Sequence, residues 1–514
     1  MMCILPLIVL FTWPCHGANI LAILPSPSYS HQIAYTHIWK ELSLRGHKVT
    51  LITTDPVKDP KLTNLTEIDM KSTYELMGKL SNISKSAFTM WNVYRTVQNF
   101  LNSVAEAQLS HAEVQSLIHN KSHFDVVLVE FIYVEFLAFA EIYDCPKILF
   151  STFDPYSLIH SLLGNPINPV LYPDMGATFY GSLNFKERVT SSLFTLYSLY
   201  YFYYESYYQK SEIIKKYFSI SRTAHELVSD VDMLFLNVNP ILQPIRALGP
   251  STIMIGGNRG VIDSTPLPKD LANFLDNAKD GFVYFSLGSN VKSKDLLTET
   301  REAIIEAFRE LPFKVLWKFE ADELPNKPDN VKIIKWAPQQ AVLSHPNIKA
   351  FVTQGGLQSF EEALYCEVPF VVIPFFGDQE QNAKVIENKG MGVVINKKFS
   401  VGKIELKNAI LEVTKNTKYH DAVKRVKQWV VDSPMTGLEK AVWWTEYVIR
   451  NKGAKHLRNP AADIPLYQYF LVDVIGFLVL AISATFLLLF LFIRTICRLV
   501  VSKYVNKISK KKSA

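Results

Sequence analysis

The stretch of sequence that decides the fold is residues 351–382, FVTQGGLQSFEEALYCEVPFVVIPFFGDQEQN. Its first residues predict a buried strand that ends at Thr353. Gly355 and Gly356 then allow a close backbone approach, and a helix is expected to begin near Leu357. A strand, a glycine turn and a helix N-terminus form an anion site from free amides and the helix dipole.

A second strand follows within the same stretch, and its loop carries polar groups. Residues 370–373 predict this strand, and Asp378 and Gln379 come after it. In α/β sheets, ligands bind at the carboxyl ends of the strands. The stretch therefore predicts an α/β domain with a polar ligand at one edge of its sheet.

Outward from this stretch, the α/β pattern continues in both directions. Residues 249–268 are rich in glycine and proline and predict an interdomain linker. The simplest architecture is two α/β domains that face each other across a cleft. Strands are expected at residues 19–24, 48–54, 125–129, 147–151, 233–236, 282–287, 314–317, 331–334 and 350–353, and helices at 31–45 and 298–310.

Residues 185–218 differ from both halves because they are crowded with aromatic side chains. An amphipathic tyrosine-rich stretch can line an apolar pocket or touch a membrane surface, and it can also simply pack in the core. The sequence leaves these alternatives open. The tyrosines and phenylalanine concerned are Tyr197, Tyr200, Tyr201, Phe202, Tyr203, Tyr204, Tyr207 and Tyr208.

The two ends of the chain predict a membrane anchor. Residues 1–17 combine a short apolar run with small residues and read as a signal peptide. Residues 471–493 are apolar over about 35 Å of helix, which is enough to cross a bilayer. Arg494 and Arg498 follow at once, so the C-terminus is expected in the cytosol and most of the mass in the lumen.

Charge and cysteine usage exclude other classes of protein. The net charge is +6, but residues 494–514 hold seven Lys or Arg and no acid, so the rest is near neutral. A basic tail without a basic face gives no support for nucleic-acid binding. Only Cys145 and Cys366 lie between the signal and the span, which excludes a disulfide framework and a multi-cysteine metal site and leaves a single bridge open.

Two further patterns concern the cellular location. Lys511 and Lys512 stand fourth and third from the C-terminus, as in dilysine retrieval signals of endoplasmic reticulum membrane proteins. The alternative is that the basic tail only fixes topology and touches anionic lipid. Glycosylation sequons, which agree with a lumenal face, begin at Asn64, Asn82 and Asn120.

The decisive stretch and two upstream segments resemble the UDP-glycosyltransferase family. Residues 336–339, Trp-Ala-Pro-Gln, resemble its uracil-binding corner, and residues 285–289, Phe-Ser-Leu-Gly-Ser, resemble its phosphate loop. The similarity runs from residue 19 through the C-terminal span, and the Gly-Gly-Leu-Gln-Ser form is closest to insect members. The resemblance implies the GT-B fold, two Rossmann-like domains facing across a cleft, here with one C-terminal transmembrane helix.

The pattern and the resemblance together give an expected division of the chain. It comprises a signal peptide (1–17), an N-terminal acceptor-binding domain (18–248), a linker (249–268), a C-terminal UDP-sugar-binding domain (269–458), a transmembrane helix (471–493) and a basic cytosolic tail (494–514).

The resemblance also implies how a UDP-sugar is held. An aromatic face suits the base, neutral donors suit the diphosphate, and acceptors suit the sugar hydroxyls. No metal is expected, and UDP-sugar is a co-substrate. The residues implied are Trp336 for uracil, Gln339 and Glu362 for the ribose, Ser289, Gln354, Gln358 and Ser359 for the diphosphate, and Asp378 and Gln379 for the sugar.

The chain departs from the family pattern at several positions. Gln354 stands where most members have His, Gln358 where many have Asn, and Glu367 where Gly is usual. Two alternatives are left open beside an enzyme. One is a catalytically inactive UDP-sugar-binding protein, which the changes at Gln354, Glu367 and Glu130 motivate. The other is a membrane scaffold of the same fold.

The catalytic base is expected from the N-terminal half. His31, in Ser-Tyr-Ser-His at a strand–loop–helix junction, matches the family's catalytic His, and an imidazole pKa near working pH suits a general base. A carboxylate should orient it. Glu130 ends a strand where the family has Asp, whereas Asp125 lies at the strand's other end. Asp230 and Asp232 form a DxD motif that we interpret as a solvated junction.

These expectations combine into one reaction. A hexose, glucose by the insect-like motif, passes from UDP to a hydroxyl of a small lipophilic acceptor. A single displacement inverts the anomeric centre. The acceptor is not readable from the sequence, and a homo-oligomer is left open.

Overall fold

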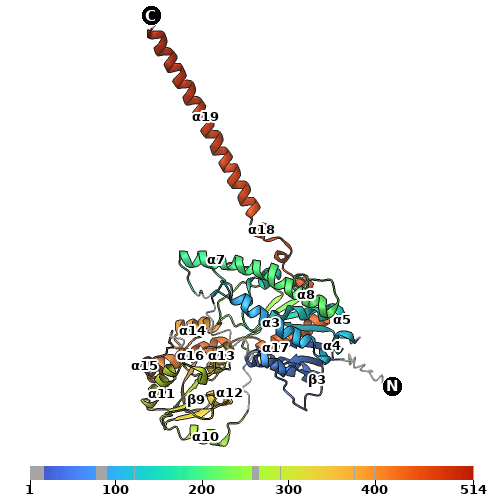
Figure 1. Cartoon of the computed structure of the whole chain (residues 1–514), viewed down its shortest axis with the longest axis vertical. Coiled ribbons are helices and arrows are strands. Elements are labelled where there is room, and N and C mark those ends of the chain that lie inside the picture. The colour runs from blue at the N-terminus through green and yellow to red at the C-terminus, as the bar shows by residue number, and fades with distance from the viewer. Residues whose placement is uncertain are drawn as a thin grey trace, which may run out of the picture. The chain divides into compact units, whose positions relative to one another are not determined.

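The computed structural model describes residues 17–76, 89–120, 122–177, 179, 181–257, 265–289, 291–375, 377–396 and 400–512 (Figure 1). The chain divides into two compact units, Met1–Asn459 and Pro460–Ala514. The expected signal peptide, except for Gly17, and the sequon at Asn82 lie outside the described residues.

The N-terminal half of the first unit contains a parallel sheet. Within the described residues it has seven strands in the order β3-β2-β1-β4-β5-β6-β7. Its central strands are continuous apolar runs, as expected for a sheet covered on both faces. The strands are β1 (Asn19–Leu24), β2 (Lys48–Thr53), β3 (Leu65–Asp69), β4 (Val126–Glu130), β5 (Lys147–Ser151), β6 (Met233–Leu236) and β7 (Thr252–Met254).

Helices connect these strands and cover the sheet. Short 3-10 helices lie at Lys71–Thr73 and Phe131–Leu137. The α-helices are α1 (Tyr29–Leu44), α3 (Val93–Leu109), α4 (Ala112–His119), α5 (Ala138–Tyr143), α6 (Ser157–Leu162), α7 (Phe185–Tyr200), α8 (Tyr207–Phe218) and α9 (Ala224–Ser229).

The C-terminal half of this unit repeats the same design. Its described residues form a parallel sheet of six strands, β10-β9-β8-β11-β12-β13. The strands are β8 (Phe282–Ser286), β9 (Lys314–Lys318), β10 (Val331–Ile334), β11 (Ile348–Thr353), β12 (Phe370–Val372) and β13 (Gly392–Val394). The helices are α10 (Lys269–Asp276), α11 (Thr298–Arg309), α12 (Gln339–Leu343), α13 (Leu357–Tyr365), α14 (Gln379–Asn388), α15 (Lys403–Lys415), α16 (Thr417–Val431) and α17 (Gly437–Arg450), with 3-10 helices at Ser293–Asp295 and Lys455–Leu457.

Both sheets reverse their strand order at one point, and this determines where ligands bind. In the first sheet the reversal lies between β1 and β4, and in the second between β8 and β11. In open α/β sheets the crevice at such a switch point, outside the carboxyl ends of the strands, is the ligand site. The predicted pair of Rossmann-like folds is therefore confirmed, and each sheet offers one such crevice.

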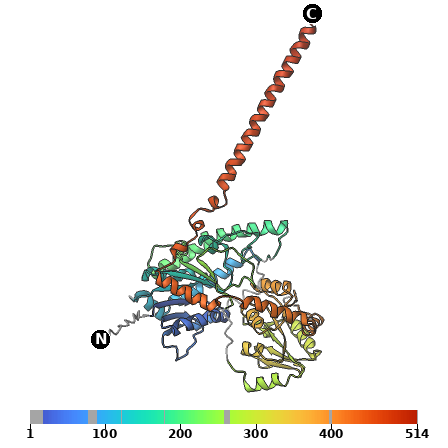
Figure 2. The same ribbon diagram turned by 180° about the vertical axis from the view of Figure 1, so that it is seen from behind.

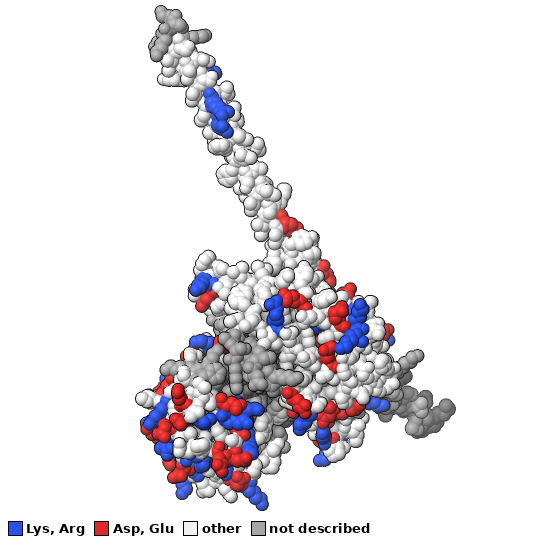
Figure 3. All heavy atoms as spheres, in the orientation of Figure 1, with Lys and Arg blue, Asp and Glu red and all other residues white. Residues whose placement is uncertain are grey.

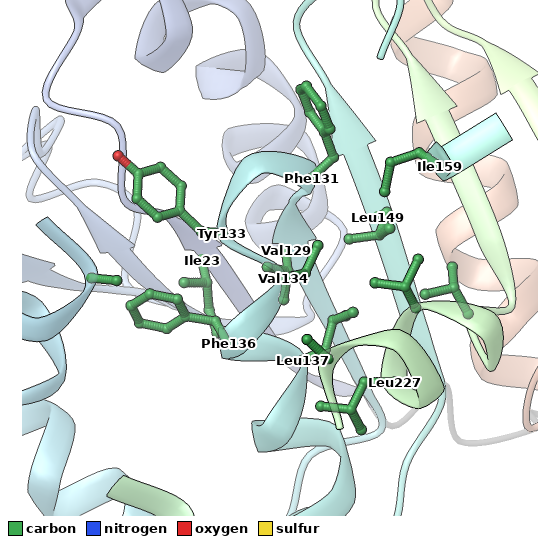
Figure 4. Packing of buried hydrophobic residues seen from close by; sticks show 14 of the residues in the cluster. Ile23, Val129, Phe131, Tyr133, Val134, Phe136, Leu137, Leu149, Ile159 and Leu227 are labelled. Carbon is green, nitrogen blue, oxygen red and sulfur yellow. The ribbon is translucent and has the colours of Figure 1, made fainter. Parts of the chain in front are cut away.

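The core of the N-terminal half forms where β4 meets the turn that follows it. Ile23 of β1, Val129 of β4 and Phe136 of the turn Phe131–Leu137 are fully buried in one apolar cluster (Figure 4). This packing holds the carboxyl end of β4 rigidly beside that of β1. The expected strand 125–129 is shifted by one residue, so that Glu130 is the last residue of β4 and pairs with Phe150.

Helix α17 belongs to the C-terminal half in sequence but packs on the N-terminal sheet. Ala441, Val442 and Val448 are buried in one cluster with Ile20 of β1 and Trp39 of α1. Figure 2 shows this orange-red helix lying against the blue N-terminal elements. The chain thus returns to its first sheet before the unit ends.

The tyrosine-rich stretch divides into a packed face and an exposed face. Helices α7 and α8 are joined by a π-helical turn, Tyr201–Ser206. Tyr201, Phe202 and Tyr207 are buried in the N-terminal core, so the packing interpretation holds for them. The exposed apolar side chains of the same stretch are Phe185, Val189, Leu193, Leu196, Tyr200, Tyr203, Tyr204 and Tyr208.

The second unit is dominated by one long helix. Helix α19 (Val472–Lys512) follows a 3-10 helix, Pro460–Asp463, and the short α18 (Leu466–Tyr469). Among the described residues, α19 is the one helix long and apolar enough to cross a membrane. Figure 3 shows its shaft almost free of charge, with basic side chains only toward the C-terminal end.

Candidate active site

The crevice at the first switch point holds His31 and Glu130. His31 lies in the first turn of α1, after the loop that leaves β1, and Glu130 ends the neighbouring β4. His31 Nδ1 is 2.5 Å from Glu130 Oε1. Since an ionised carboxylate only accepts, Nδ1 carries the hydrogen of this contact. The structure thus brings together the two residues that the sequence predicts as base and orienting group.

Further polar groups fix this pair in place. Ser26 Oγ donates to Glu130 Oε2 at 2.6 Å, and Thr152 Oγ1 lies 3.1 Å from His31 Nδ1. Glu130 is fully buried, so its charge depends on these partners. Burial and the nearby Glu130 charge raise the pKa of Tyr133, which keeps that hydroxyl protonated.

Asp125 lies at the opposite end of β4, as its position in sequence suggested. Its Oδ2 accepts a hydrogen bond from the Asn19 amide at 2.7 Å, and its Oδ1 lies 3.2 Å from His123 Nε2. These contacts join the starts of β4 and β1. Asp125 therefore has a structural contact far along the strand from His31.

The second switch point holds the expected phosphate loop. Gly288 has a φ of +77°, and a Cβ at this position would lie 2.0 Å from Gln354 Nε2. The left-handed φ favours glycine here, and any side chain at this position would have to displace the end of Gln354. Gln354 is 6% exposed, and its Oε1 has no hydrogen-bond partner among the described residues. A buried amide with one free end is what an incoming polar ligand can satisfy.

The loop after β12 supports the start of helix α13. Asp378 Oδ2 accepts hydrogen bonds from the Leu357 amide at 3.1 Å and from Asn382 Nδ2 at 2.9 Å. Burial raises the pKa of Asp378 above its ordinary value, although these bonds act against the rise. Gln379 Oε1 accepts from the Phe375 amide at 2.9 Å. Gln379 is thus held by the backbone of its own loop, and Asp378 by the first amide of α13 and the Asn382 side chain.

The expected uracil and ribose residues gather at the other side of the phosphate loop. Trp336 is 54% exposed, with its ring edge-on to Tyr29 at 5.1 Å and the Lys318 ammonium 5.4 Å from its centre. Gln339 Nε2 donates to Glu362 Oε2 at 2.5 Å and to Ser359 Oγ at 3.0 Å. The groups assigned to the ribose therefore bond to one another here.

Two adjacent cavities accommodate these residues. The first, of about 400 Å³, reaches from His31 and Gln354 to Asp378 and into the apolar interior of the N-terminal half. The second, of about 380 Å³, lies at Trp336. Both volumes lie in the range of small-molecule sites. The residues that line both are Ser30, Gly288, Ser289, Gln358 and Ser359.

The sequence predicts that the DxD motif, Asp230 and Asp232, is a solvated junction. This prediction is wrong for Asp232. Asp232 is buried and accepts hydrogen bonds from the amides of Lys147 and Ala454. Asp230 is desolvated, but Lys455 and Lys147 outweigh this and hold its pKa well below the usual range. Among the described residues, no group of three His, Cys, Asp or Glu could hold a metal ion.

Sequence reasoning missed three residues of the site. Ser26 and Thr152 contact the His31–Glu130 pair, and Lys318 Nζ donates to Gly288 O at 2.9 Å. All three lie at or just after the carboxyl end of a parallel strand. That position was the available signal, because these ends line the ligand crevice.

The two predicted sequons in described residues differ in exposure. Asn120 is exposed at the end of α4, with Nδ2 donating to Ser116 Oγ at 2.8 Å. Asn64 is half-buried and donates from Nδ2 to Ser43 O at 3.3 Å. The side chains of Lys511 and Lys512 lie outside the described residues. Cys145 and Cys366 are both free.

The two doubly wound sheets make up the GT-B fold of glycosyltransferases. The His31–Glu130 pair lies at one crevice and the Gly288 loop at the other. The chain belongs to the UDP-glucoronosyl and UDP-glucosyl transferase family, whose model matches residues 19–511. It is therefore a UDP-glycosyltransferase.

Individual relatives agree with this membership. UDP-glucosyltransferase 2 of Dactylopius coccus is 33% identical, over 95% of this chain and 94% of its own length. Human UDP-glucuronosyltransferase 2B7 is 29% identical, over 94% of each chain. Among solved structures, a UDP-glucose:anthocyanidin 3-O-glucosyltransferase in complex with UDP matches with a TM-score of 0.57 and 18% identity. That match covers 85% of this chain and 99% of the other, and it supports the fold.

Proposed function

We propose that this enzyme transfers glucose from UDP-glucose to a hydroxyl of a small lipophilic acceptor, with inversion at the anomeric carbon. The observation that carries the proposal is the 2.5 Å contact between His31 Nδ1 and Glu130 Oε1 at the wall of the larger cavity. An inactive binding protein would have no need to keep a buried carboxylate against this imidazole, at the cost of desolvating it.

The proton transfer follows from this contact. Because Nδ1 is engaged by Glu130, Nε2 is the ring nitrogen that takes the acceptor's proton. Glu130 stabilises the imidazolium that results. UDP leaves, and its charge is met by Ser289 and by the amide of Gly356, the N-cap residue of helix α13. One displacement of this kind converts an α-linked donor to a β-glycoside.

The charges near the predicted sugar site favour glucose over glucuronate. Asp378 lines the larger cavity beside Gln379, and a glucuronate carboxylate would meet this acid. Of the described residues that line the cavity, Arg246 is the one Lys or Arg, and its guanidinium pairs with Asp154 at 2.9 Å. Like charges in a shared site disfavour binding.

The test is UDP release by the full chain in microsomes. UDP-glucose and UDP-glucuronate are compared with a panel of phenols and sterols, with and without EDTA. We expect UDP-glucose to be preferred, product to form in proportion to UDP, and EDTA to have no effect, because the assigned phosphate contacts are neutral donors. Absence of acceptor-dependent UDP release with both donors would overturn the proposal. Loss in EDTA that Mn²⁺ restores would overturn its metal independence.

We further propose that the catalytic unit lies in the lumen of the endoplasmic reticulum and that Lys511 and Lys512 retain it there. The support is the apolar helix α19, the basic residues that follow its apolar part, and the exposed sequon at Asn120. Changing both lysines to Ser should make the glycans resistant to endoglycosidase H, even with two lysines added back near Lys503. Persistent sensitivity would mean that retention has another cause.

A further inference from the structure

A second polar cluster faces the larger cavity on the acceptor side, and the proposed reaction makes no use of it. Asp154 follows β5 two residues after Thr152, which contacts His31. Its carboxylate lines the cavity and is 37% exposed. Its Oδ1 lies 3.0 Å from His160 Nε2 and its Oδ2 lies 2.9 Å from Arg246 Nη2. The two partners are buried behind it.

The hydrogen bonds around His160 define its protonation. Asn165 Oδ1 accepts from the Gly249 amide at 2.7 Å, so the amide nitrogen of Asn165 must face His160 Nδ1, 3.3 Å away. That nitrogen can only donate, so Nδ1 accepts and Nε2 carries the hydrogen that Asp154 receives. Burial and the nearby Arg246 lower the pKa of His160, in agreement with a neutral ring.

The cluster therefore contains an ionised Asp154 carboxylate but is neutral overall. Burial alone would raise the pKa of Asp154, but His160 and Arg246 outweigh it and hold that pKa below the ordinary value. The carboxylate is ionised, and the single positive charge of Arg246 compensates it. A neutral O–H or N–H donor gains a charge-assisted bond here, whereas a cation gains little net attraction.

Asp154 differs from the other aspartate of the same cavity wall. Asp174 is 1% exposed, and its two oxygens accept bonds from the hydroxyls of Tyr94 and Ser198 and from the amides of Ser157 and Gly176. It has no capacity left for a ligand. Among the described residues, each oxygen of Asp154 contacts a single donor and keeps acceptor capacity at the cavity.

Most of the remaining wall around Asp154 is apolar. It includes Leu171, Met175, Leu236, Val238 and Met254. A lipophilic acceptor can bury its skeleton against these side chains. Polar side chains also line the wall, and the Gln243 amide nitrogen, which has no partner among the described residues, can donate to a hydroxyl oxygen. Asp154 instead accepts the hydroxyl hydrogen, and a charged acceptor gives the stronger bond. A second hydroxyl is thus favoured most at Asp154.

We propose that Asp154 is an acceptor-binding residue, and that the enzyme selects lipophilic acceptors with two hydroxyl groups, one that reacts at His31 and one that donates a hydrogen bond to the Asp154 carboxylate. This inference rests on the proposed function. It assigns the class of acceptor that the transfer reaction uses.

The test compares acceptors that differ only in the second hydroxyl. Microsomes with the full chain receive UDP-glucose and 1,5-, 2,6- or 2,7-dihydroxynaphthalene, or the monomethyl ether of each, or the parent naphthols. The measured quantity is the ratio of kcat/KM for the diol to that for its methyl ether or parent. A factor of about two follows from two reactive hydroxyls alone, and a hydrogen bond to a charged group adds about tenfold or more for the isomer of correct spacing.

The variants separate recognition from folding, because each ratio is formed within one protein preparation. Asp154→Ala should lower the ratio of the preferred isomer to about two, and Asp154→Asn should give an intermediate value. Asp154→Ala combined with Arg246→Met, which leaves no unpaired buried charge, should match Asp154→Ala. Asp174→Asn should lose stability but keep the wild-type ratio.

Three results would overturn the inference: a wild-type ratio near two for every isomer, a ratio unchanged in Asp154→Ala, or an equal fall in Asp174→Asn. Transfer to none of the naphthols, their ethers, or the phenols and sterols of the first test would instead overturn the proposed function, and the acceptor class with it.

Discussion

The two halves of the catalytic unit build their parts of the site in different ways. In the C-terminal half, Gln354, Asp378 and Gln379 come from one stretch of sequence, and the fold places them through two adjacent strands, β11 and β12. In the N-terminal half, His31 contacts Glu130 and Thr152, which lie 99 and 121 residues further along the chain. The fold brings these three residues together. The proposed sugar side of the donor site is thus local in sequence, although Ser289 and Trp336 join the nucleotide side from other segments. The proposed base and acceptor pocket are products of the fold.

This difference predicts how strongly a substitution in each half affects the site. A site assembled from one loop system can lose a single ligand contact and keep its shape, because the backbone amides and the helix N-terminus remain. A pair assembled across two strands depends on both side chains at once. We therefore expect the largest effects of substitution in the N-terminal half and smaller ones in the C-terminal half.

The strongest test removes the base. His31→Ala should lower the rate of transfer by about 10²–10⁴-fold, the usual contribution of a general base. UDP affinity should change little, because the nucleotide residues lie on the other sheet. Single-turnover transfer and UDP titration on the same preparation check both expectations. Near-normal turnover would show that His31 is not the base. An equal loss of UDP binding would show that the base and the nucleotide site do not lie in separate halves.

The next test compares the two carboxylates of one strand. Glu130→Gln should slow turnover by up to about 10⁴-fold, the loss found when the carboxylate that orients a catalytic histidine is changed to its amide. Asp125→Asn should leave kcat nearly unchanged, because Asp125 contacts the Asn19 amide at the far end of β4.

Thermal unfolding of both variants provides the control. Asp125→Asn weakens a strand junction and should lower the unfolding temperature at least as much as Glu130→Gln does. If instead Asp125→Asn slows catalysis more, Glu130 is the wrong carboxylate.

The donor half should respond more weakly and in a different observable. Gln354→Ala should weaken UDP binding by about tenfold, the equivalent of one hydrogen bond to a charged group, with little effect on kcat. Gln354→His should make UDP binding tighter as pH falls through about 6.5, because a protonated imidazole adds a positive charge at the diphosphate. The wild-type glutamine cannot titrate, so its contribution should not change over that range. Identical pH profiles for wild type and Gln354→His would show that position 354 does not face the diphosphate.

How far the sequence predicts each half follows from the same contrast. Most strands and the glycine turn at Gly355 are predictable because periodicity and conformational need are local. The short β3, β7 and β13 are not predicted, and β7, which pairs with β6, lies inside the stretch 249–268 that is expected to be a linker. The contact of Thr152 with His31 and the burial of Asp232 against residue 454 are not, because they depend on which strands lie side by side. The position of α17 on the first sheet is missed for the same reason, since its apolar face indicates burial but not the partner.

One departure from the family pattern is explained by a backbone angle. Glu367, where the resemblance predicts Gly, has a φ of +60° at the C-terminal end of α13. Its amide donates to Leu364 O, and the next amide, of Val368, donates to Ala363 O, so the left-handed residue ends the helix. A residue with a Cβ pays roughly 1–2 kcal/mol for this conformation. The side chain recovers part of that through an ion pair with Lys427 at 2.8 Å.

The smallest expected effect therefore concerns stability and leaves catalysis unchanged. Glu367→Gly should raise the stability of the C-terminal half by roughly 0.5–1 kcal/mol, since relief of left-handed strain outweighs a half-buried ion pair worth at most about 1 kcal/mol. Glu367→Ala keeps the strain and loses the ion pair, so it should be less stable than wild type. Lys427→Met isolates the ion pair and should cost wild type a few tenths of a kcal/mol and Glu367→Gly nothing. Thermal unfolding of the detergent-solubilised chain orders the five proteins, wild type, the three single variants and Glu367→Gly with Lys427→Met. If Glu367→Gly unfolds no later than Glu367→Ala, the strain at this helix end does not limit stability. Another contact would then have to stabilise Glu367 in its left-handed conformation. The C-terminal half would no longer be the half in which substitutions have the smaller effects.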